Sequence, residues 1–233
     1  VIQDYDASLS GLAAGTYSVY ARNAGQTCEY SLGQVTIDQP AAILGTATAT
    51  NASCYGQSDG TITAEVTSGG TSPFQYQLED GSGNVIVAYG SALPLGQSTT
   101  FNNLASGTYQ VSVKDANGGL SLIAKSIVVS EPSQIIATES VSQPLCPGET
   151  GSVTMRISGG TGTYEYNLNG GVWASIVSGG VIPNIAIGSY SINIRDNNLC
   201  QITAPITGNI APTDNEAPVF TFCPTGGTVP NTA

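Results

Sequence analysis

The residue types that carry most enzyme chemistry are scarce in this chain. It contains no histidine, which excludes Ser–His and Cys–His nucleophilic pairs and histidine-bound metals. No glycine-rich loop is followed by the lysine of a phosphate-binding loop. Paired carboxylates could hydrolyse glycosides, but the acidic residues recur in equivalent loops of a repeat, whereas a working pair is expected once. The sequence therefore predicts no catalytic residues and no enzyme.

Oxygen donors that could bind calcium occur in two places. Around Asp80, Ser and Asn alternate as in part of a calcium loop, but no bidentate glutamate follows, which favours a hydrogen-bonded turn. Near the end of the chain, Asp214, Asn215 and Glu216 resemble the calcium-binding linker of cadherins. Calcium takes about six to eight oxygens, so a neighbouring loop would have to add ligands. No other cofactor is expected.

Aromatic side chains could stack on sugars. Trp173 is one candidate, but the tyrosines at inward strand positions are predicted to be core residues: Tyr17, Tyr76, Tyr109, Tyr166 and Tyr190. Three aspartates in turn-rich sequence are predicted to be turn residues: Asp59, Asp115 and Asp196. A basic residue occupies one equivalent strand end in three places, where a structural role is expected: Arg22, Lys114 and Arg195.

The elements that position these residues follow from a segment that occurs three times, at residues 12–23, 104–115 and 185–196. Each copy has an aliphatic residue, a glycine and a tyrosine, followed by alternating apolar and polar residues. Such alternation predicts a strand with one buried face. The turn before it resembles the tyrosine corner of an immunoglobulin-like sandwich, in which the hydroxyl returns to a backbone group upstream.

The spacing of the copies sets the architecture. Their glycines, Gly15, Gly107 and Gly188, lie 92 and 81 residues apart, which fits whole tandem domains better than solenoid units. Within the middle copy, further strands are expected at residues 47–52, 61–66, 74–78 and 122–129. The predicted fold class is all-β, with tandem immunoglobulin-like antiparallel β-sandwich repeats arranged end to end.

Four domains are expected. Residues 1–43 hold the second half of a first repeat, whose other strands should lie before Val1 or come from another chain. Residues 44–135 and 136–213 form complete repeats, and residues 214–233 begin another module. Between the third and sixth strands, the middle repeat is nine residues longer than the third, in an irregular section from Asp80 to Asn103.

Charge and cysteine content exclude several classes of partner. The formal net charge is −11 and only 9% of residues are charged, so binding to a nucleic-acid backbone is excluded. No apolar run approaches the roughly 20 residues of a membrane span, and a charged-then-apolar leader is not expected in the first residues. The five cysteines lie in loop-like sequence without CxxC spacing, which favours a secreted, oxidising setting over a metal site.

The combined motifs resemble the SprB-type repeat of Bacteroidota gliding adhesins and other very large surface proteins. The residues that carry the resemblance are Cys54, Gly56, Asp59, Gly60, Ile62, Gly69, Gly70, Pro73, Tyr76, Leu104, Gly107, Tyr109 and Asp115. The third copy departs at Glu149 to Gly151, and the middle copy has Gly119 where Cys200 stands in the third. Residues 214–224 resemble the opening of a hyalin-repeat module.

The resemblance implies a non-catalytic part of a secreted, cell-surface adhesin or filament, connected with gliding and exported by the type IX route. Its repeats would serve as stalk and contact surface, with neighbouring repeats, a surface polysaccharide or another cell-surface protein as partners. The alternative is a carbohydrate-binding module array, with the insertion between Asp80 and Asn103 as the site.

Two disulfide pairings stay open. The resemblance implies a bond between Cys146 and Cys200 within the third copy. In an immunoglobulin-like sandwich, however, those two loops lie at opposite ends, roughly 23 Å apart, while a disulfide needs Cα atoms within about 7 Å. End-to-end stacking would instead bring Cys54 of one repeat to Cys200 of the next. With either pairing, Cys28 is expected to find its partner before Val1, and Cys223 beyond Ala233.

Overall fold

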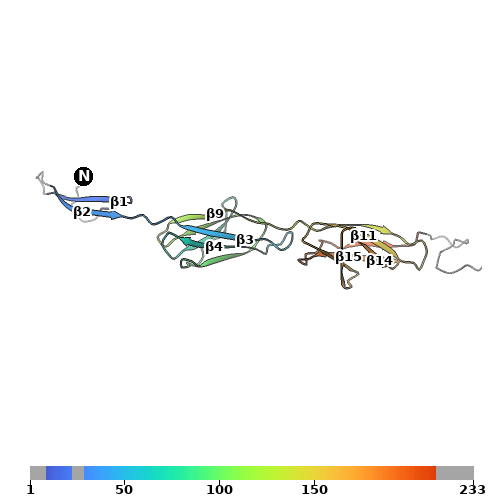
Figure 1. Cartoon of the computed structure of the whole chain (residues 1–233). Coiled ribbons are helices and arrows are strands. Elements are labelled where there is room, and N and C mark those ends of the chain that lie inside the picture. Colours follow the sequence, from blue (N-terminus) through green and yellow to red (C-terminus); the bar gives the residue numbers. More distant parts are fainter. Residues whose placement is uncertain (1–8, 23–28, 214–233) are drawn as a thin grey trace, which may run out of the picture. The chain divides into compact units, whose positions relative to one another are not determined.

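The computed structural model describes residues 9–22 and 29–213, and every regular element in these ranges is a β-strand (Figure 1). The strands form several antiparallel sheets. The described ranges hold no long apolar helix that could cross a membrane. The chain is thus an all-β protein of tandem β-sandwich repeats, as the sequence predicts.

Residue contacts divide the chain into two compact units. The first comprises residues 1–47, 64–99 and 110–125, and the second comprises residues 48–63, 100–109 and 126–233. The domain limits expected from the sequence stay predictions. We use them only as names: the middle repeat is residues 44–135, and the third repeat is residues 136–213.

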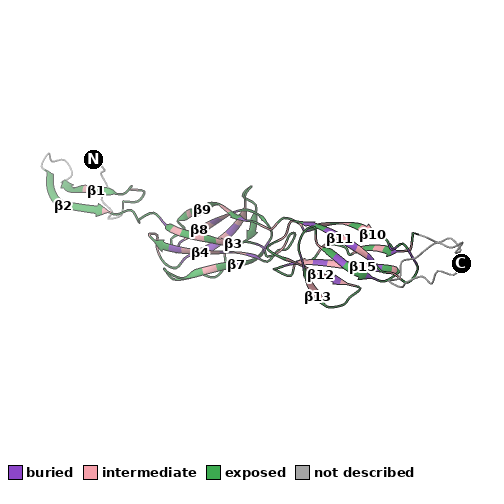
Figure 2. Cartoon of the chain, turned by 45° about the vertical axis from the view of Figure 1, so that its right-hand side comes forward, coloured by how far each residue is buried: buried purple, intermediate pink, exposed green. Residues whose placement is uncertain are grey.

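The first described element is a two-stranded hairpin of β1 (Gly15–Arg22) and β2 (Glu29–Ile37). Most of its residues are exposed, and both strands are largely green in Figure 2. Tyr17 opens β1, and its hydroxyl donates to the carbonyl of Ala13 at 2.7 Å. This is the tyrosine corner that the sequence indicates.

The middle repeat contains two sheets. One has the order β3-β4-β7 and the other β6-β5-β8-β9. The strand bounds are β3 Leu44–Thr50, β4 Gly60–Ser68, β5 Gln75–Asp80, β6 Val85–Val87, β7 Ser98–Leu104, β8 Gly107–Lys114 and β9 Leu120–Val129. Alternate residues of β4, β5 and β8 are buried, as expected for strands with one face on a core.

The third repeat has the same plan, and its last strand is half as long as that of the middle repeat. Its sheets have the orders β10-β11-β14 and β13-β12-β15-β16. The strand bounds are β10 Ile136–Ser142, β11 Gly151–Ser158, β12 Tyr164–Leu168, β13 Trp173–Ile176, β14 Val181–Ile185, β15 Gly188–Asp196 and β16 Ile206–Ile210. Val153, Met155, Ile192 and Ile194 are fully buried in one apolar cluster, so the two sheets share a core.

One sequence-based expectation is wrong. The section from Asp80 to Asn103 is not irregular throughout, because it contains β6 and most of β7. The alternating pattern does not detect β7, because only Phe101 and Leu104 of its seven residues are buried. Asn103 also takes a positive φ of 59°, which interrupts the regular pleat just before the tyrosine corner.

Candidate functional site

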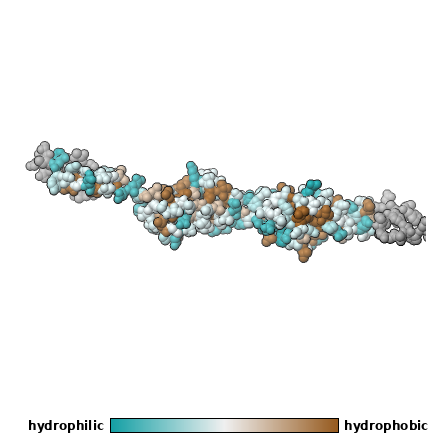
Figure 3. Space-filling model, in the orientation of Figure 1, coloured by the Kyte–Doolittle hydropathy of each residue, from teal (hydrophilic) through white to brown (hydrophobic). Residues whose placement is uncertain are grey.

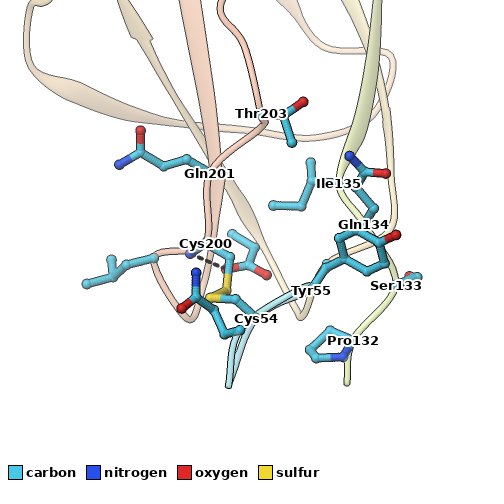
Figure 4. A pocket seen from close by; sticks show the side chains of 13 residues that line it. Cys54, Tyr55, Pro132, Ser133, Gln134, Ile135, Cys200, Gln201 and Thr203 are labelled. Carbon is cyan, nitrogen blue, oxygen red and sulfur yellow. Dashed lines mark hydrogen bonds between the residues drawn. A yellow bond between two sulfur atoms is a disulfide. The ribbon is translucent and has the colours of Figure 1, made fainter. Parts of the chain in front are cut away.

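The described residues contain one disulfide with both partners defined, between Cys54 and Cys200 (Figure 4). Their Cα atoms lie 5.6 Å apart although 146 residues separate them in sequence. The bond joins the loop between β3 and β4 to the turn after β15, and both belong to the second compact unit. Of the two pairings that the sequence leaves open, the structure has this one.

Cys146 does not pair with Cys200 but takes part in a disulfide of its own. The pairing within the third copy, which the family resemblance implies, is therefore not the one in the structure. The sequence-based geometric argument gives the reason, since the loops before β11 and after β15 are expected at opposite ends of a sandwich. The expectations for Cys28 and Cys223 lie outside the described residues.

The loop that carries Cys54 is shaped by Asp59. The Asp59 carboxylate accepts hydrogen bonds from the Ser53 amide at 2.9 Å and from the Ser53 hydroxyl. The hydroxyl bond, followed by the amide bond, lowers the pKa of Asp59. Farther along the loop, the Gly56 amide donates to Oε2 of Glu131 at 2.6 Å. Asp59 is thus a turn residue, as predicted, and it holds the cysteine in place.

The turn that carries Cys200 is shaped by Asp196, which is 1% exposed. Its Oδ1 accepts from the amides of Asn198 at 2.9 Å and Cys200 at 3.0 Å. Its Oδ2 accepts from the Thr161 amide at 2.8 Å. One buried carboxylate therefore builds the turn and ties it to the loop between β11 and β12, which exceeds the turn role predicted from the sequence.

Polar contacts accompany the disulfide. The side-chain amide of Asn198 donates to the Ser53 carbonyl at 3.1 Å. The Cys200 sulfur lies 3.4 Å from the same oxygen, a contact without a proton because the sulfur is in a disulfide. The Cys54 loop is thus held at three places: Cys200, Asn198 and Glu131.

A pocket of about 330 Å³ lies beside the disulfide (Figure 4). Its lining residues are Cys54, Tyr55, Gln57, Pro132, Ser133, Gln134, Ile135, Gly160, Asp196, Leu199, Cys200, Gln201 and Thr203. The one charged group among them is Asp196, whose two oxygens already accept three hydrogen bonds. No histidine, lysine or arginine lies among these lining residues.

The candidate calcium loop at Asp80 is a hydrogen-bonded turn. Oδ1 of Asp80 accepts from the amides of Ser82 at 2.8 Å and Asn84 at 2.9 Å, and its Oδ2 accepts from the Asn84 side chain. The bonds from Asn84 are the main cause of the lowered pKa of Asp80. Among the described residues, no cluster of three or more His, Cys, Asp or Glu could hold a metal ion. Asp214, Asn215 and Glu216 lie outside them.

The insertion of the middle repeat is anchored by a buried tyrosine. The Tyr76 hydroxyl accepts from the Val66 amide at 2.9 Å and donates to the Gln97 carbonyl at 3.2 Å. In the third repeat, the Ser178 hydroxyl satisfies the corresponding Ile157 amide at 2.9 Å. Burial raises the pKa of Tyr76. The Tyr76 hydroxyl thus ties the insertion, at Gln97, to the backbone of β4 at Val66.

Apolar side chains elsewhere in the insertion are exposed. Val85, Ile86 and Val87 of β6 and Leu95 in the following loop have exposed fractions of 41–54%. Carbohydrate sites combine such surfaces with aromatic and polar groups. The section from Asp80 to Asn103 has two aromatic residues, Tyr89 and Phe101, and Phe101 is buried.

Trp173 is covered on one face. The Arg195 guanidinium lies 4.2 Å from the centroid of the Trp173 ring. Arg195 also forms a salt bridge to Glu165, with Nη2 and Oε2 2.6 Å apart. One face of the Trp173 ring is thus occupied by a cation–π contact, and Arg195 has the structural role that the sequence predicts.

The described fold is that of tandem β-sandwich repeats, joined in sequence by short proline-containing segments. Residues 46–83 and 138–172 match the family model of the SprB repeat. These matches cover β4, β5, β11 and β12 with their preceding loops. The chain therefore contains two SprB-type repeats. A comparison with curated proteins found no match.

Proposed function

We propose that this chain is a non-catalytic repeat region of a large secreted, cell-surface adhesin or filament. SprB repeats are structural repeats that occur in cell-surface proteins. The observation that carries the proposal is the bond from Cys54 of the middle repeat to Cys200 of the third. Disulfides persist in oxidising compartments outside the cell, where a surface filament functions.

The stalk role follows from what the bond does to the chain. Cys54 and Cys200 close a loop over two successive SprB repeats, so partial unfolding cannot pull these two points apart. Asn198 adds a hydrogen bond between the two repeats, and Glu131 fixes the Cys54 loop from the end of the middle repeat. A series of modules fastened in this way resists extension, which suits an adhesin that bears load between a cell and its substratum.

The contact role follows from the surface. Charged residues make up 9% of the chain, and pale residues of intermediate hydropathy dominate the face shown in Figure 3. Such a surface can contact a polysaccharide or another surface protein through hydroxyl and amide groups without strong charge attraction. We place the chain in a gliding-related adhesin exported by the type IX route.

Surface labelling of the source cells tests the proposal. Antibodies raised against this chain should stain intact cells, and protease added outside should remove the signal while a cytoplasmic marker survives. A strain without the type IX secretion machinery should retain the antigen inside. Staining that requires permeabilised cells in the wild type would contradict the proposal.

A further inference from the structure

The middle repeat, together with the residues just before it, has its own copy of the cleft that the Cys54 loop helps to line. This second cleft has a volume of about 360 Å³ and lies within the first compact unit. Its lining residues are Gln39, Pro40, Ala41, Ala42, Ile43, Gly70, Asp115, Asn117, Gly119 and Leu120. Each has a counterpart at the same repeat position in the third repeat or in the segment just before it, for example Cys200 for Gly119 and Pro132 for Pro40.

The backbone frames of the two clefts agree in their hydrogen bonds. In the middle repeat, Asp115 accepts from the amides of Thr71 at 2.9 Å, Asn117 at 3.0 Å and Gly119 at 2.7 Å. Asp196 accepts the three corresponding bonds in the third repeat. The Gly70 amide donates to the Ala41 carbonyl at 2.8 Å, and the corresponding Gly160 amide donates to the Ser133 carbonyl at the same distance.

Two of the three groups that hold the Cys54 loop have polar counterparts here. Asn117 stands where Asn198 donates to the Ser53 carbonyl, and its amide now donates to the Thr71 hydroxyl at 3.0 Å. Gln39 stands where Glu131 accepts from the Gly56 amide, and a glutamine carbonyl can accept the same bond. Only the thiol is missing, because Gly119 replaces Cys200.

From this correspondence we propose that the cleft around Asp115 is a docking site for the Ser-Cys-aromatic-Gly loop of a preceding SprB repeat. The loop binds through Asn117 and Gln39 and is held reversibly, since position 119 has no sulfur. The junction between the middle and third repeats is the same interaction with a covalent bond added. Junctions with and without the bond would therefore give a fibre both permanent and releasable joints.

This inference goes beyond the proposed function, because a surface adhesin does not require the loop of one repeat to dock in the cleft of the next. If the loop did not bind, the chain could still be exposed on the cell surface. If the chain were found inside the cell, it could still bind the loop. The two proposals are therefore tested by separate measurements.

Disulfide capture on the full chain tests the docking site. The probe is a synthetic peptide of residues 50–60, whose single cysteine, Cys54, carries glutathione as a mixed disulfide. A Gly119→Cys variant supplies a thiol where Cys200 stands in the third repeat, and its thiolate attacks the peptide sulfur and releases glutathione. The native backbone there matches a cysteine position, although the Cβ would lie 3.1 Å from Oδ1 of Asp115.

Gly90→Cys is the matched control, because Gly90 lies in the same repeat and a Cβ there would meet no atom within 4 Å. Two recovered hydrogen bonds predict roughly 5- to 150-fold greater capture at position 119 than at position 90 at equilibrium. Asn117→Ala in the Gly119→Cys background should remove most of that excess. The wild-type chain is a second control, because it shows how much peptide reacts with the native cysteines. Peptide mapping assigns each adduct to its cysteine.

Equal capture at positions 119 and 90, or equal capture of a peptide with the same composition in scrambled order, would overturn the proposal. Should Gly119→Cys fail to fold by circular dichroism, the wild-type chain decides the matter. A fluorescent residue 50–60 peptide with Cys54→Ser should then show saturable anisotropy that Asn117→Ala weakens, and anisotropy equal for both chains would overturn the proposal.

Discussion

The Tyr190 hydroxyl donates a 2.6 Å hydrogen bond to Oε2 of Glu139 on β10. The corresponding tyrosines, Tyr17 and Tyr109, donate instead to a carbonyl four residues upstream, at 2.7 and 2.8 Å. The third repeat therefore keeps the tyrosine of the corner, but its hydroxyl donates to a carboxylate in the facing sheet instead of to the upstream backbone.

Two substitutions between the repeats explain the difference. Tyr190 pairs across the sheet with Gly208, where an added Cβ would collide with the tyrosine ring and hydroxyl. The middle repeat has Ile127 at that position and Ala47 at the position of Glu139. With isoleucine in place of this glycine and alanine in place of Glu139, Tyr109 keeps its upstream carbonyl.

The first prediction concerns the strength of this bond. Tyr190→Phe should lower the free energy of unfolding of the third repeat by about 1.5 kcal/mol, as expected for a hydrogen bond to a charged group. Fluorescence of Trp173, the chain's single tryptophan, reports this transition in urea. Tyr17→Phe is the control in another part of the chain and should leave the Trp173 transition in place. An unchanged midpoint for Tyr190→Phe would contradict the assignment.

The second prediction is a loss of stability at high pH. Burial, and then the bond to Glu139, raise the pKa of Tyr190 above its ordinary value, which is about 10. Above that pH the unfolded chain releases the proton while the folded chain keeps it, so stability is complete below pH ~10 and falls as the pH rises further. Trp173-detected unfolding between pH 8 and 11 should show this slope, and Tyr190→Phe should reduce it.

The third prediction is a loss of stability in acid that depends on Asp115. The Thr71 amide, followed by the amides of Gly119 and Asn117, holds the pKa of Asp115 below its ordinary value. The stabilisation is therefore present above pH ~3.9 and is lost as the pH falls through the lower pKa of the folded chain.

Asp115→Asn should lower the melting temperature at pH 7, because an amide group cannot accept bonds on both sides, and should flatten the acid dependence. Asp38→Asn, at an exposed position between strands, is the matched control. Identical melting curves for the two variants from pH 2 to 7 would refute the role of Asp115.

The fold was predictable where one sheet face is buried. Tyr109, Val111 and Val113 alternate with polar residues, and all three are buried in β8. β7 was missed because its sequence is mostly polar and the period-two signal is absent. Local pattern thus identifies strands that face the core and misses those held mainly by backbone pairing.

The site was predictable in part. The family resemblance implied one pairing for Cys200 and the expected stacking of sandwiches another, and choosing between them needed the spatial relation of two loops. Asn198 and Glu131 were missed because they bind a backbone carbonyl and a backbone amide, which leave no pattern in the sequence. The two aspartates that build the turns, Asp115 and Asp196, were recognised as turn residues, but not their bonds to a second loop.

The fourth prediction separates the stalk from the carbohydrate-binding alternative. If the insertion between Asp80 and Asn103 is a structural expansion, a glycan array should give no saturable binding that depends on it. The matched variant is Ile86→Ser with Leu95→Ser, which removes exposed apolar surface and leaves the Tyr76 anchor intact. Saturable binding to the wild type that this variant loses would favour the carbohydrate-binding alternative.

The fifth prediction concerns the Cys54–Cys200 bond. Non-reducing peptide mapping of the native chain should yield one peptide pair that joins these two cysteines, and a pair that joins Cys146 to Cys200 would contradict the structure. The bond closes a loop of 146 residues, and such crosslinks typically contribute about 2–5 kcal/mol by restricting the unfolded chain.

Paired Cys54→Ser and Cys200→Ser substitutions should therefore lower the unfolding free energy by about 2–5 kcal/mol. The folded-state hydrogen bond from Asn198 to Ser53 should persist. Adding Asn198→Ala to that double variant tests the rest of the junction, since it should cost a further ~1 kcal/mol only if the loop still docks without the bond. Peptide fragments from limited proteolysis should then show cleavage at Tyr55, which is half exposed, rising in the triple variant above the double. Equal cleavage in the two variants would mean that the disulfide alone holds the Cys54 loop. This junction would then give no support to the reversible docking inferred for the middle repeat.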